Sequence, residues 1–398
     1  MPRKKKDSDT LEVKFEVTYE YNVKFTRDVF GDGNETLAEA LGAGADSPVR
    51  VMLVAERAVV EQTPELGRKI GKYFKEHNIA LAGRAFVVGG GEINKTNGMT
   101  TVRQITEAAA NAALDKRDFI LVIGGGAMLD AAGFAAASLN RGLRIVRMPS
   151  TLLAQSEGAS YPAVATNILN RKDASGVFAA PFASIVDFDF LKTLSESQRR
   201  EGLAEAVKIA AVKDVKFLNW INKNAEKLSA GDAAAQEELV RRSAALHVET
   251  LLKSKDPFGP AAERVLEFGH WCAHRIEALG RFRVSHGAAL AIGLCVDTAY
   301  AVAMKLVPEE DADLVGETLA RTGALAGIEQ NAAVLERADD LISGIEEFRL
   351  HTGGLPVFPG PLGKVAEVES VDAGKMKEII LELRKTCGEI EKLEADRA

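Results

Sequence analysis

The strongest constraint on the fold is an alternation between two kinds of segment over residues 49–187. Short apolar runs rich in β-branched residues are separated by longer stretches with helical periodicity. This alternation is typical of a parallel sheet covered by helices on both faces. We expect strands over residues 49–54, 84–88, 119–123, 143–148 and 183–187. The intervening segments predict helices that end near residue 77 and that cover residues 101–113 and 128–139.

The pattern changes near Ser195, where the β-rich runs give way to long segments rich in Ala, Leu, Glu and Lys. A chain of 398 residues is long enough for two domains. We predict an α/β, Rossmann-like domain over residues 1–194 and an all-helical domain over residues 195–398, with the ligand site between them. Residues 1–10 are expected to form a disordered tail. Residues 13–30 alternate polar and apolar side chains, which predicts a strand or a hairpin with one solvated face.

The composition argues against nucleic-acid and membrane partners. The net charge is −7, and the one basic run, residues 3–6, belongs to the charged N-terminal stretch. A phosphate-binding surface would require clustered cations. We find no apolar run of membrane-spanning length and no signal-peptide core. The three widely spaced cysteines, Cys272, Cys295 and Cys387, favour a reducing, cytoplasmic location over a disulfide framework.

Two glycine-rich turns follow predicted strands and could bind a nucleotide. In FILVIGGGAMLDAAG, glycines 124–126 connect a strand to a helix whose first turn contains Asp130. Glycines let the backbone approach a pyrophosphate, and a helix N-terminus attracts it. The pattern is not GxGxxG, so a tight turn without a ligand explains this segment equally well. The second turn, residues 89–95, strengthens the nucleotide hypothesis and contains Glu92 and Lys95, which could also be a solvated charge pair.

Three segments of the predicted helical domain contain residues that bind divalent metals. Glu205 lies in the apolar stretch GLAEAVK, with Lys208 one helical turn later. A carboxylate on an apolar face is costly unless it is paired or bound to a metal. The segment FGHWCAH places His270 and His274 on one helix face, and His286 follows in SHG. One glutamate with two or three histidines suits a catalytic zinc site, and satisfied core histidines are the alternative.

Six motifs, in this order, resemble 3-dehydroquinate synthase and the related sugar phosphate cyclases. They are GGGxxxDxxGF, STLLAQ, FDFLKTL, GLAEAVK, LEFGHWCAHRIE and SHGAALAIG, and the resemblance spans about residues 50–300. The segments SKDPFG, FGHW and FRLHTGG look more like a dehydroquinate synthase-like branch found in Ebo-type biosynthetic clusters. The resemblance implies the dehydroquinate synthase fold and a homodimer. It also implies an NAD- and metal-dependent enzyme of the carbon–oxygen lyase type.

The resemblance also implies roles for individual positions. The ligands of Zn²⁺ or Co²⁺ would be Glu205, His270 and His286. The positions that match NAD contacts are Glu92, Lys95, Gly125, Gly126, Asp130, Ser150, Thr151 and Lys172. Catalytic or substrate-binding roles would belong to Lys208, His274, Lys172, Glu157 and Arg264, with Lys375 a further match. Arg141 matches an arginine that reaches the substrate phosphate in the partner subunit of a dimer.

Five positions depart from the family pattern, and all of them match substrate contacts. Glu157 replaces an aspartate, Ala163 a lysine, Asp173 an asparagine, Ala288 a glutamate, and Glu267 an asparagine or aspartate. The loss of a lysine and the gain of acid remove positive charge that a phosphorylated sugar acid would need. We therefore expect a sugar phosphate substrate other than the usual precursor of dehydroquinate.

The reaction that the resemblance implies uses NAD and returns it within one turnover. NAD oxidises a secondary alcohol, phosphate is eliminated, NADH reduces the ketone, and an intramolecular aldol reaction closes a carbocycle. A metal would stabilise the alkoxide, while Lys208 and His274 move protons. One alternative is a polyol or glycerol dehydrogenase of the same fold, which would accumulate NADH. Another is a catalytically impaired homologue that still binds NAD and metal.

Overall fold

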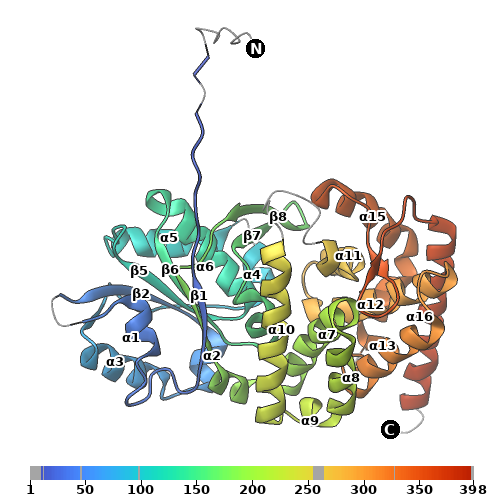
Figure 1. Ribbon diagram of the computed structural model, residues 1–398, viewed down its shortest axis with the longest axis horizontal. Helices are drawn as coiled ribbons and strands as arrows, with labels where there is room; N and C mark the ends of the chain where they lie inside the picture. Colours follow the sequence, from blue (N-terminus) through green and yellow to red (C-terminus); the bar gives the residue numbers. More distant parts are fainter. Residues whose placement is uncertain are drawn as a thin grey trace, which may run out of the picture.

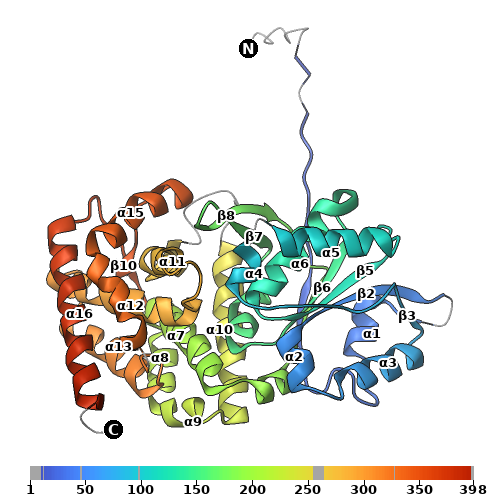
Figure 2. The same cartoon turned by 180° about the vertical axis from the view of Figure 1, so that it is seen from behind.

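The computed structural model consists of an α/β half and a helical half that lie side by side (Figures 1 and 2). The structure describes residues 10–11, 13–44, 47–96, 99–253, 264–326 and 328–395. Except for Thr10, the tail expected over residues 1–10 lies outside this range, as does the SKDPFG motif. The first helix of the helical half, α7 (Glu196–Lys213), is N-capped by Ser195, which also forms a capping box with Gln198. The predicted change from α/β to helical structure is therefore confirmed, while the exact domain limits stay a prediction.

Seven parallel strands form the sheet of the α/β half. They are β1 (Asn22–Thr26), β2 (Val49–Glu56), β3 (Ile79–Leu81), β4 (Phe86–Val88), β5 (Phe119–Gly124), β6 (Arg144–Pro149) and β9 (Ala183–Asp187). Their spatial order is β1-β9-β6-β5-β2-β3, with β4 also paired to β2. Each of the five strands predicted for this sheet is present, with ends shifted by at most one or two residues.

Buried apolar side chains cover both faces of this sheet, as a parallel sheet requires. On one face, α1 (Thr36–Leu41) and α3 (Leu66–Glu76) pack through residues such as Leu37 and Tyr73. On the other face lie α5 (Thr100–Asn111) and α6 (Gly126–Ser138). The short helix α2 (Arg57–Gln62) follows β2 directly, and α4 (Glu92–Thr96) follows β4 after the glycine turn 89–91. Each of these connections leaves the carboxyl edge of the sheet.

Several β elements differ from the prediction. The described part of residues 13–30 contains one strand, β1, which pairs in parallel with β9, so the hairpin interpretation is wrong. The antiparallel hairpin β7 (Ala163–Ile168) and β8 (Arg171–Phe178) was not predicted, because its short strands mix polar and apolar residues without clear alternation. The helical half also contains a two-stranded hairpin, β10 (Phe358–Pro359) and β11 (Val365–Ala366), so it is not strictly all-helical.

The helical half is built around α12 (His286–Ala303). Around it lie α8 (Val215–Lys223), α9 (Ala225–Ser229), α10 (Ala233–Lys253), α11 (His270–Leu279), α13 (Glu309–Arg321), α14 (Ile328–Asn331), α15 (Ala338–Thr352) and α16 (Ala373–Ala395). By length and composition α12 could cross a membrane. Its side chains instead fill the apolar core of the helical half, as expected for the central helix of a helical domain.

Candidate active site

The three predicted metal ligands come together from three helices. Glu205 lies in the middle of α7, and His270 and His286 are the first residues of α11 and α12. One ligand atom from each side chain lies within 4.8 Å of the other two. The ring centroids of His270 and His286 are 5.4 Å apart. This is a compact set of two imidazoles and one carboxylate, which suits Zn²⁺ or Co²⁺.

The Glu205 side chain is held through only one of its carboxylate oxygens. Lys208 Nζ lies 2.6 Å from Glu205 Oε1, and His247 Nε2 lies 3.3 Å from the same oxygen. Among the described residues, Oε2 is buried and has no hydrogen-bond partner. Burial raises the pKa of Glu205, but Lys208 and His247 lower it to about 2. Glu205 is therefore ionised, with one oxygen available to a cation.

His270 presents a second buried atom without a partner. In the described part of the chain, its Nδ1 makes no hydrogen bond. Burial and the nearby positive charge of Lys208 hold the pKa of His270 well below its ordinary value. The ring is therefore neutral, which is the form that binds metals. Because unpaired buried polar atoms are costly, an unpaired nitrogen and an unpaired oxygen in one site fit a bound divalent cation.

Glu277, a buried carboxylate on α11, connects the metal set to Lys172. Glu277 Oε2 lies 3.0 Å from His286 Nδ1, and Glu277 Oε1 lies 3.1 Å from Lys172 Nζ. A carboxylate behind a ligand histidine fixes the tautomer and the orientation of its ring. Glu277 is absent from the residues predicted from sequence. An acidic residue one helical turn after His274 is the signal that could have identified it.

On the side of the sheet, Lys172 and Lys95 hold a cluster of carboxylates. Lys172 Nζ lies 2.5 Å from Glu92 Oε1. Lys95 Nζ lies 2.5 Å from both Asp130 Oδ2 and Asp173 Oδ1, and 3.9 Å from Glu92. Buried lysines of this kind are stable only when their charge is compensated. The expected proximity of Glu92 and Lys95 is thus observed, and Lys172 joins this cluster to Glu277.

Glu56, at the end of β2, was also missed from sequence. Its Oε2 accepts a hydrogen bond of 2.8 Å from the backbone N–H of Gly125. A Cβ at Gly90 would lie 1.8 Å from Glu56 Oε1, so a larger residue there would displace the Glu56 carboxylate. Glu56 therefore lies between the two glycine-rich turns. Its position directly after a buried strand, at the edge where open α/β sheets bind ligands, was the available signal.

The remaining predicted cofactor positions also lie at the carboxyl edge. Ser150 follows β6 and donates from its backbone N–H to the Gly124 carbonyl at 2.9 Å. Thr151 Oγ1 accepts from the Ala154 N–H at 3.1 Å. Gly126 is the first residue of α6. A cavity of about 550 Å³ lies beside the end of β4 and is lined in part by Gly89.

Of the other predicted site residues, one lies beside the metal set and three lie elsewhere. Glu157 is in the π-helical segment Ala154–Gly158, and its carboxylate approaches Glu205 and His247 within 4.8 Å. Arg264 donates to the Leu355 carbonyl at 2.7 Å, and Lys375 pairs with Glu378 on the surface of α16. Arg141 is exposed after α6. The roles of these four residues stay predictions.

A cavity of about 210 Å³ opens beside Lys172 and His274. Trp271 and His351 line other parts of its wall. Trp271 is held in place by a hydrogen bond of 2.7 Å from its Nε1 to Asp297 on α12. The His274 ring is 5.2 Å from that of His270, so this cavity adjoins the metal set. The cavity has the size of a small polyol, which would contact Lys172 and His274.

The ion-paired residues of the site carry more negative than positive charge. Three buried lysines and five carboxylates form its ion pairs, which leaves a net charge of −2: Lys95, Lys172, Lys208, Glu92, Asp130, Asp173, Glu205 and Glu277. Uncompensated charge is costly in a buried site. One divalent ion bound by the Glu–His–His set would balance it.

His247, on α10, is the third residue missed from sequence. Its Nδ1 lies 2.9 Å from the Ser243 carbonyl, which orients the ring toward Glu205. We predict that His247→Phe weakens metal binding about ten- to hundredfold, as loss of an outer-shell partner commonly does. Competition with a chromophoric chelator measures this. His351→Phe, on the far wall of the small cavity, is the matched control and should leave the metal affinity unchanged.

The arrangement of sheet, helical half and Glu–His–His set defines a recognised class of fold. The 2-epi-5-epi-valiolone synthase of Streptomyces hygroscopicus subsp. jinggangensis 5008, solved with NAD⁺ and Zn²⁺, superposes with a TM-score of 0.81 at 21% identity, over 95% of this chain and 99% of its own. A 2-deoxy-scyllo-inosose synthase, solved with carbaglucose-6-phosphate, NAD⁺ and Co²⁺, gives a TM-score of 0.72 at 22% identity, over 91% and 96%.

Sequence comparison identifies the family. Residues 85–201 match the model of the 3-dehydroquinate synthase N-terminal domain, and residues 202–339 match that of the C-terminal domain. The 2-epi-valiolone synthase of Actinosynnema mirum is 33% identical over 310 residues, which is 76% of this chain and 80% of that protein. The chain therefore belongs to the 3-dehydroquinate synthase family of sugar phosphate cyclases, as the motifs predict. Its assignment to the Ebo-type branch stays a prediction.

Proposed function

We propose that this enzyme is an NAD- and divalent-metal-dependent sugar phosphate cyclase whose substrate is not the usual dehydroquinate precursor. The observation that carries the proposal is a series of polar contacts between the metal set and the glycine-rich edge of the sheet. His286, in the set with Glu205 and His270, contacts Glu277. Glu277 in turn pairs with Lys172, which pairs with Glu92 at the edge of the sheet. NAD⁺ with Zn²⁺ or Co²⁺ in the two solved neighbours supports the choice of cofactors.

The residues beside the small cavity are suited to proton transfer. When bound, the cation would polarise a substrate hydroxyl and NAD would accept hydride from its carbon. Burial lowers the pKa of His274 to about 4, so its neutral ring can accept a proton near pH 7. Lys172 lies between Glu92 and Glu277 and can orient a substrate oxygen between the two halves. Lys208 keeps Glu205 ionised.

The altered positions favour a less anionic substrate. Ala163 begins β7 and Ala288 lies in the first turn of α12, so both present only methyl groups where family members carry charged side chains. The Asp173 carboxylate forms an ion pair with Lys95 and neutralises part of the positive charge of the lysine. A phosphorylated sugar without a carboxylate needs fewer cationic partners than a sugar acid does.

We also infer a cytoplasmic homodimer. Arg141 is exposed at the turn after α6, where it can reach a neighbouring subunit and contact substrate phosphate, as the family resemblance implies. None of the three cysteines, all in the described part of the chain, forms a disulfide, which fits a reducing compartment.

The proposal is tested with the purified, metal-loaded enzyme, NAD and a panel of heptulose phosphates. Phosphate release and NADH absorbance are followed in the same cuvette. Release of phosphate without net NADH supports a cyclase. Steady accumulation of NADH on small diols would identify a polyol dehydrogenase instead. Tight binding of NAD and metal without turnover on any sugar phosphate would identify a catalytically impaired homologue.

Asp173→Asn tests the charge argument. The amide keeps a hydrogen-bond acceptor for Lys95 but removes one negative charge from the site. We predict that KM for the active heptulose phosphate falls about three- to tenfold, because a charge within a few ångströms contributes on the order of 1 kcal/mol. Asp115→Asn, which removes an exposed carboxylate paired with Arg117, is the control. An unchanged KM in the Asp173 variant would contradict the charge argument.

A further inference from the structure

A bulge in β8 brings two consecutive side chains, those of Lys172 and Asp173, into the same charge cluster at the edge of the sheet. In a regular strand they would point to opposite faces. Here the register shifts between Thr166 and Ile168 of β7, so residues 172–174 lie opposite a single residue. Asp173 has a φ of 52°, a left-handed conformation that aspartate and asparagine adopt more readily than most residues. A bulge of this kind redirects a side chain toward a site.

The Asp173 carboxylate is ionised and faces the space at the sheet edge. Its Oδ1 lies 2.5 Å from Lys95 Nζ, and 28% of its side-chain surface is exposed. Its backbone N–H donates to Asn167 Oδ1 at 2.9 Å, which fixes the bulge. Burial raises the pKa of Asp173, but the charges of Lys95 and Lys172 hold it well below its ordinary value. A ligand at this edge therefore meets a full negative charge.

This one carboxylate sets the sign of the charge at the sheet edge. Two lysines, Lys95 and Lys172, form ion pairs there with three acids, Glu92, Asp130 and Asp173. The five side chains together carry a net charge of −1. An asparagine at position 173 would leave the same set neutral. The charge that a cofactor meets at this edge thus depends on Asp173.

Asp173 also lies toward the metal set. In the proposed function, on which this inference rests, hydride passes from a carbon at the metal set to the nicotinamide ring, so the ring has to reach the space between that set and the sheet edge. Lys172 spans this space, because it pairs with Glu92 at the edge and with Glu277 behind His286. Asp173 is the next residue. Burial lowers the pKa of His274, and the charges of Glu277 and Asp173 oppose this effect.

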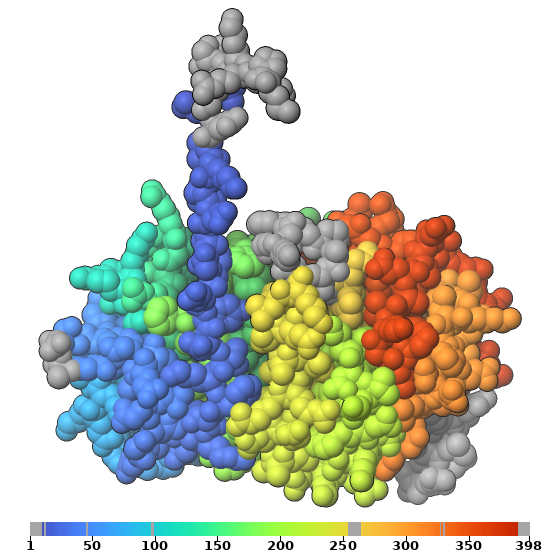
Figure 3. Space-filling model, viewed as in Figure 1, coloured from blue at the N-terminus to red at the C-terminus, as the bar shows by residue number. Residues whose placement is uncertain are grey.

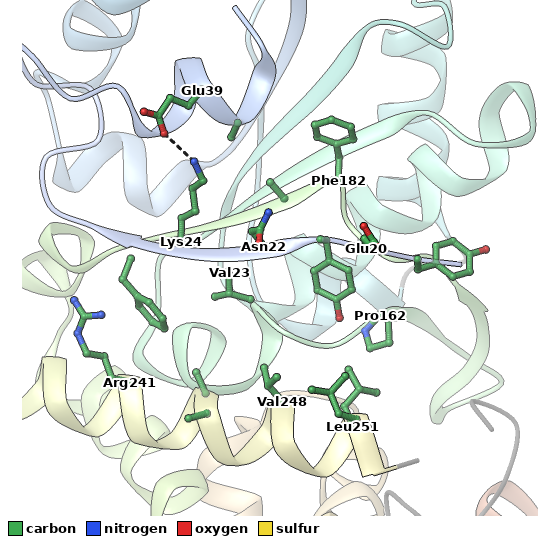
Figure 4. Close-up of a pocket in the computed structure, with 18 of the residues that line it drawn as sticks. Glu20, Asn22, Val23, Lys24, Glu39, Pro162, Phe182, Arg241, Val248 and Leu251 are labelled. Carbon is green, nitrogen blue, oxygen red and sulfur yellow. Dashed lines mark hydrogen bonds and ion pairs between the residues drawn. The ribbon is translucent and has the colours of Figure 1, made fainter. Parts of the chain in front are cut away.

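The groove between β1 and α10 is a poor alternative place for the dinucleotide. It measures about 1420 Å³, and its walls are largely apolar, with side chains such as Val23, Phe182 and Val248 (Figure 4). It lies at the root of the N-terminal arm, the described residues 11 and 13–21, which projects from the body with apolar side chains exposed (Figures 1 and 3). The described residues that line the groove include none from the glycine-rich turns, the charge cluster or the metal set.

We propose that Asp173 shifts the nucleotide preference of this site toward NAD⁺ over NADH. The two forms share the adenosine, the pyrophosphate and both riboses, and only the oxidised nicotinamide ring carries a positive charge. A nearby carboxylate favours the charged ring over the neutral one.

This preference bears on the internal redox cycle. Oxidation of the substrate alcohol transfers a hydride to the ring and a proton to a base, and the ring loses its charge. When the hydride returns to a ketone carbon and a proton to the ketone oxygen, the charge and its attraction to Asp173 are restored. Asp173 thereby favours the return of the hydride, which is the step that distinguishes a cyclase from a dehydrogenase.

Equilibrium binding of NAD⁺ and NADH to the full-length, metal-loaded protein without substrate tests the proposal. The fluorescence of bound NADH gives one dissociation constant, and displacement of NADH by NAD⁺ gives the other. Asp173→Asn should lower the ratio Kd(NADH)/Kd(NAD⁺) about tenfold, which corresponds to about 1.4 kcal/mol. Asparagine also adopts the left-handed backbone of this position, so the bulge should persist.

Two further variants separate charge from shape. Asp173→Glu keeps the negative charge on a longer side chain, and its ratio should stay within about threefold of the wild-type value. Asp115→Asn removes an exposed carboxylate that pairs with Arg117, and it should leave the ratio unchanged. Because each ratio compares two nucleotides on one protein, a general loss of nucleotide affinity cancels.

An unchanged ratio in Asp173→Asn, with both nucleotides still bound, would overturn this inference and leave the proposed function intact. Equal falls in Asp173→Asn and Asp173→Glu would also overturn it, because shape rather than charge would then be responsible. Binding of neither nucleotide to the wild-type protein would contradict both the inference and the proposed function. The expected ratios without phosphate release from any heptulose phosphate would support the inference and contradict the proposed function alone.

Discussion

Alanine in place of His270 or His286 should remove the bound metal and lower phosphate release by about 1,000-fold or more. Each variant deletes one of three ligands whose donor atoms lie within 4.8 Å of one another. It also leaves the site with its net negative charge uncompensated. The metal content of the desalted protein, measured by atomic absorption, is the primary result. Phosphate release with the active heptulose phosphate is the second.

Cys272→Ala is the matched control for these variants. Cys272 is also buried on α11, two residues after His270, but its side chain lies in the apolar core rather than in the metal set. This variant should keep one metal ion per chain. NAD binding should persist in all three variants, which shows that the α/β half is intact. Full metal content in both histidine variants would contradict the proposed site, whatever their activity.

Lys172→Met should cost about 3–5 kcal/mol of unfolding free energy and also abolish turnover. The lysine is the ion-pair partner of two buried carboxylates, Glu92 and Glu277, that approach it from the two halves of the molecule. Removing one partner of a buried pair leaves charge that is neither solvated nor compensated. Urea denaturation measures the loss. Lys192→Met, which removes an exposed pair with Asp189, should cost no more than about 1 kcal/mol.

The pH dependence of stability gives this prediction a second readout. Burial raises the pKa of Glu277, but Lys172 and His286 together lower it to about 2, below its ordinary value of 4.5. A carboxyl group with a lowered pKa stabilises the folded state above pH 4.5, and this contribution is lost as the pH falls toward 2. The wild-type protein should therefore lose stability over this range. Without Lys172 the loss should be smaller, and an unchanged slope would contradict the assigned role of the lysine.

Sequence alone determined the features that depend on local periodicity and on residue chemistry. The buried strands of the parallel sheet are continuous apolar runs, which are visible without knowledge of their neighbours. Glu205 was identified because a carboxylate within an apolar helix needs a partner. His270 and His274 were identified because i and i+4 share a helix face. The family motifs then predicted which of these residues share one metal, and the structure brings them together.

Tertiary structure alone decided which side chains connect the two halves. Lys172 and Glu277 are 105 positions apart in sequence, and Glu56 is 69 positions from the Gly125 N–H that it binds. No periodicity reports contacts at such separations, because they depend on how the sheet and the helices pack. The same reason explains why His247 was missed and why the alternation over residues 13–30 was ambiguous. That pattern shows which side chains share a face, but only the fold shows that β1 pairs with β9 and that the apolar face of the arm before it stays exposed within one chain.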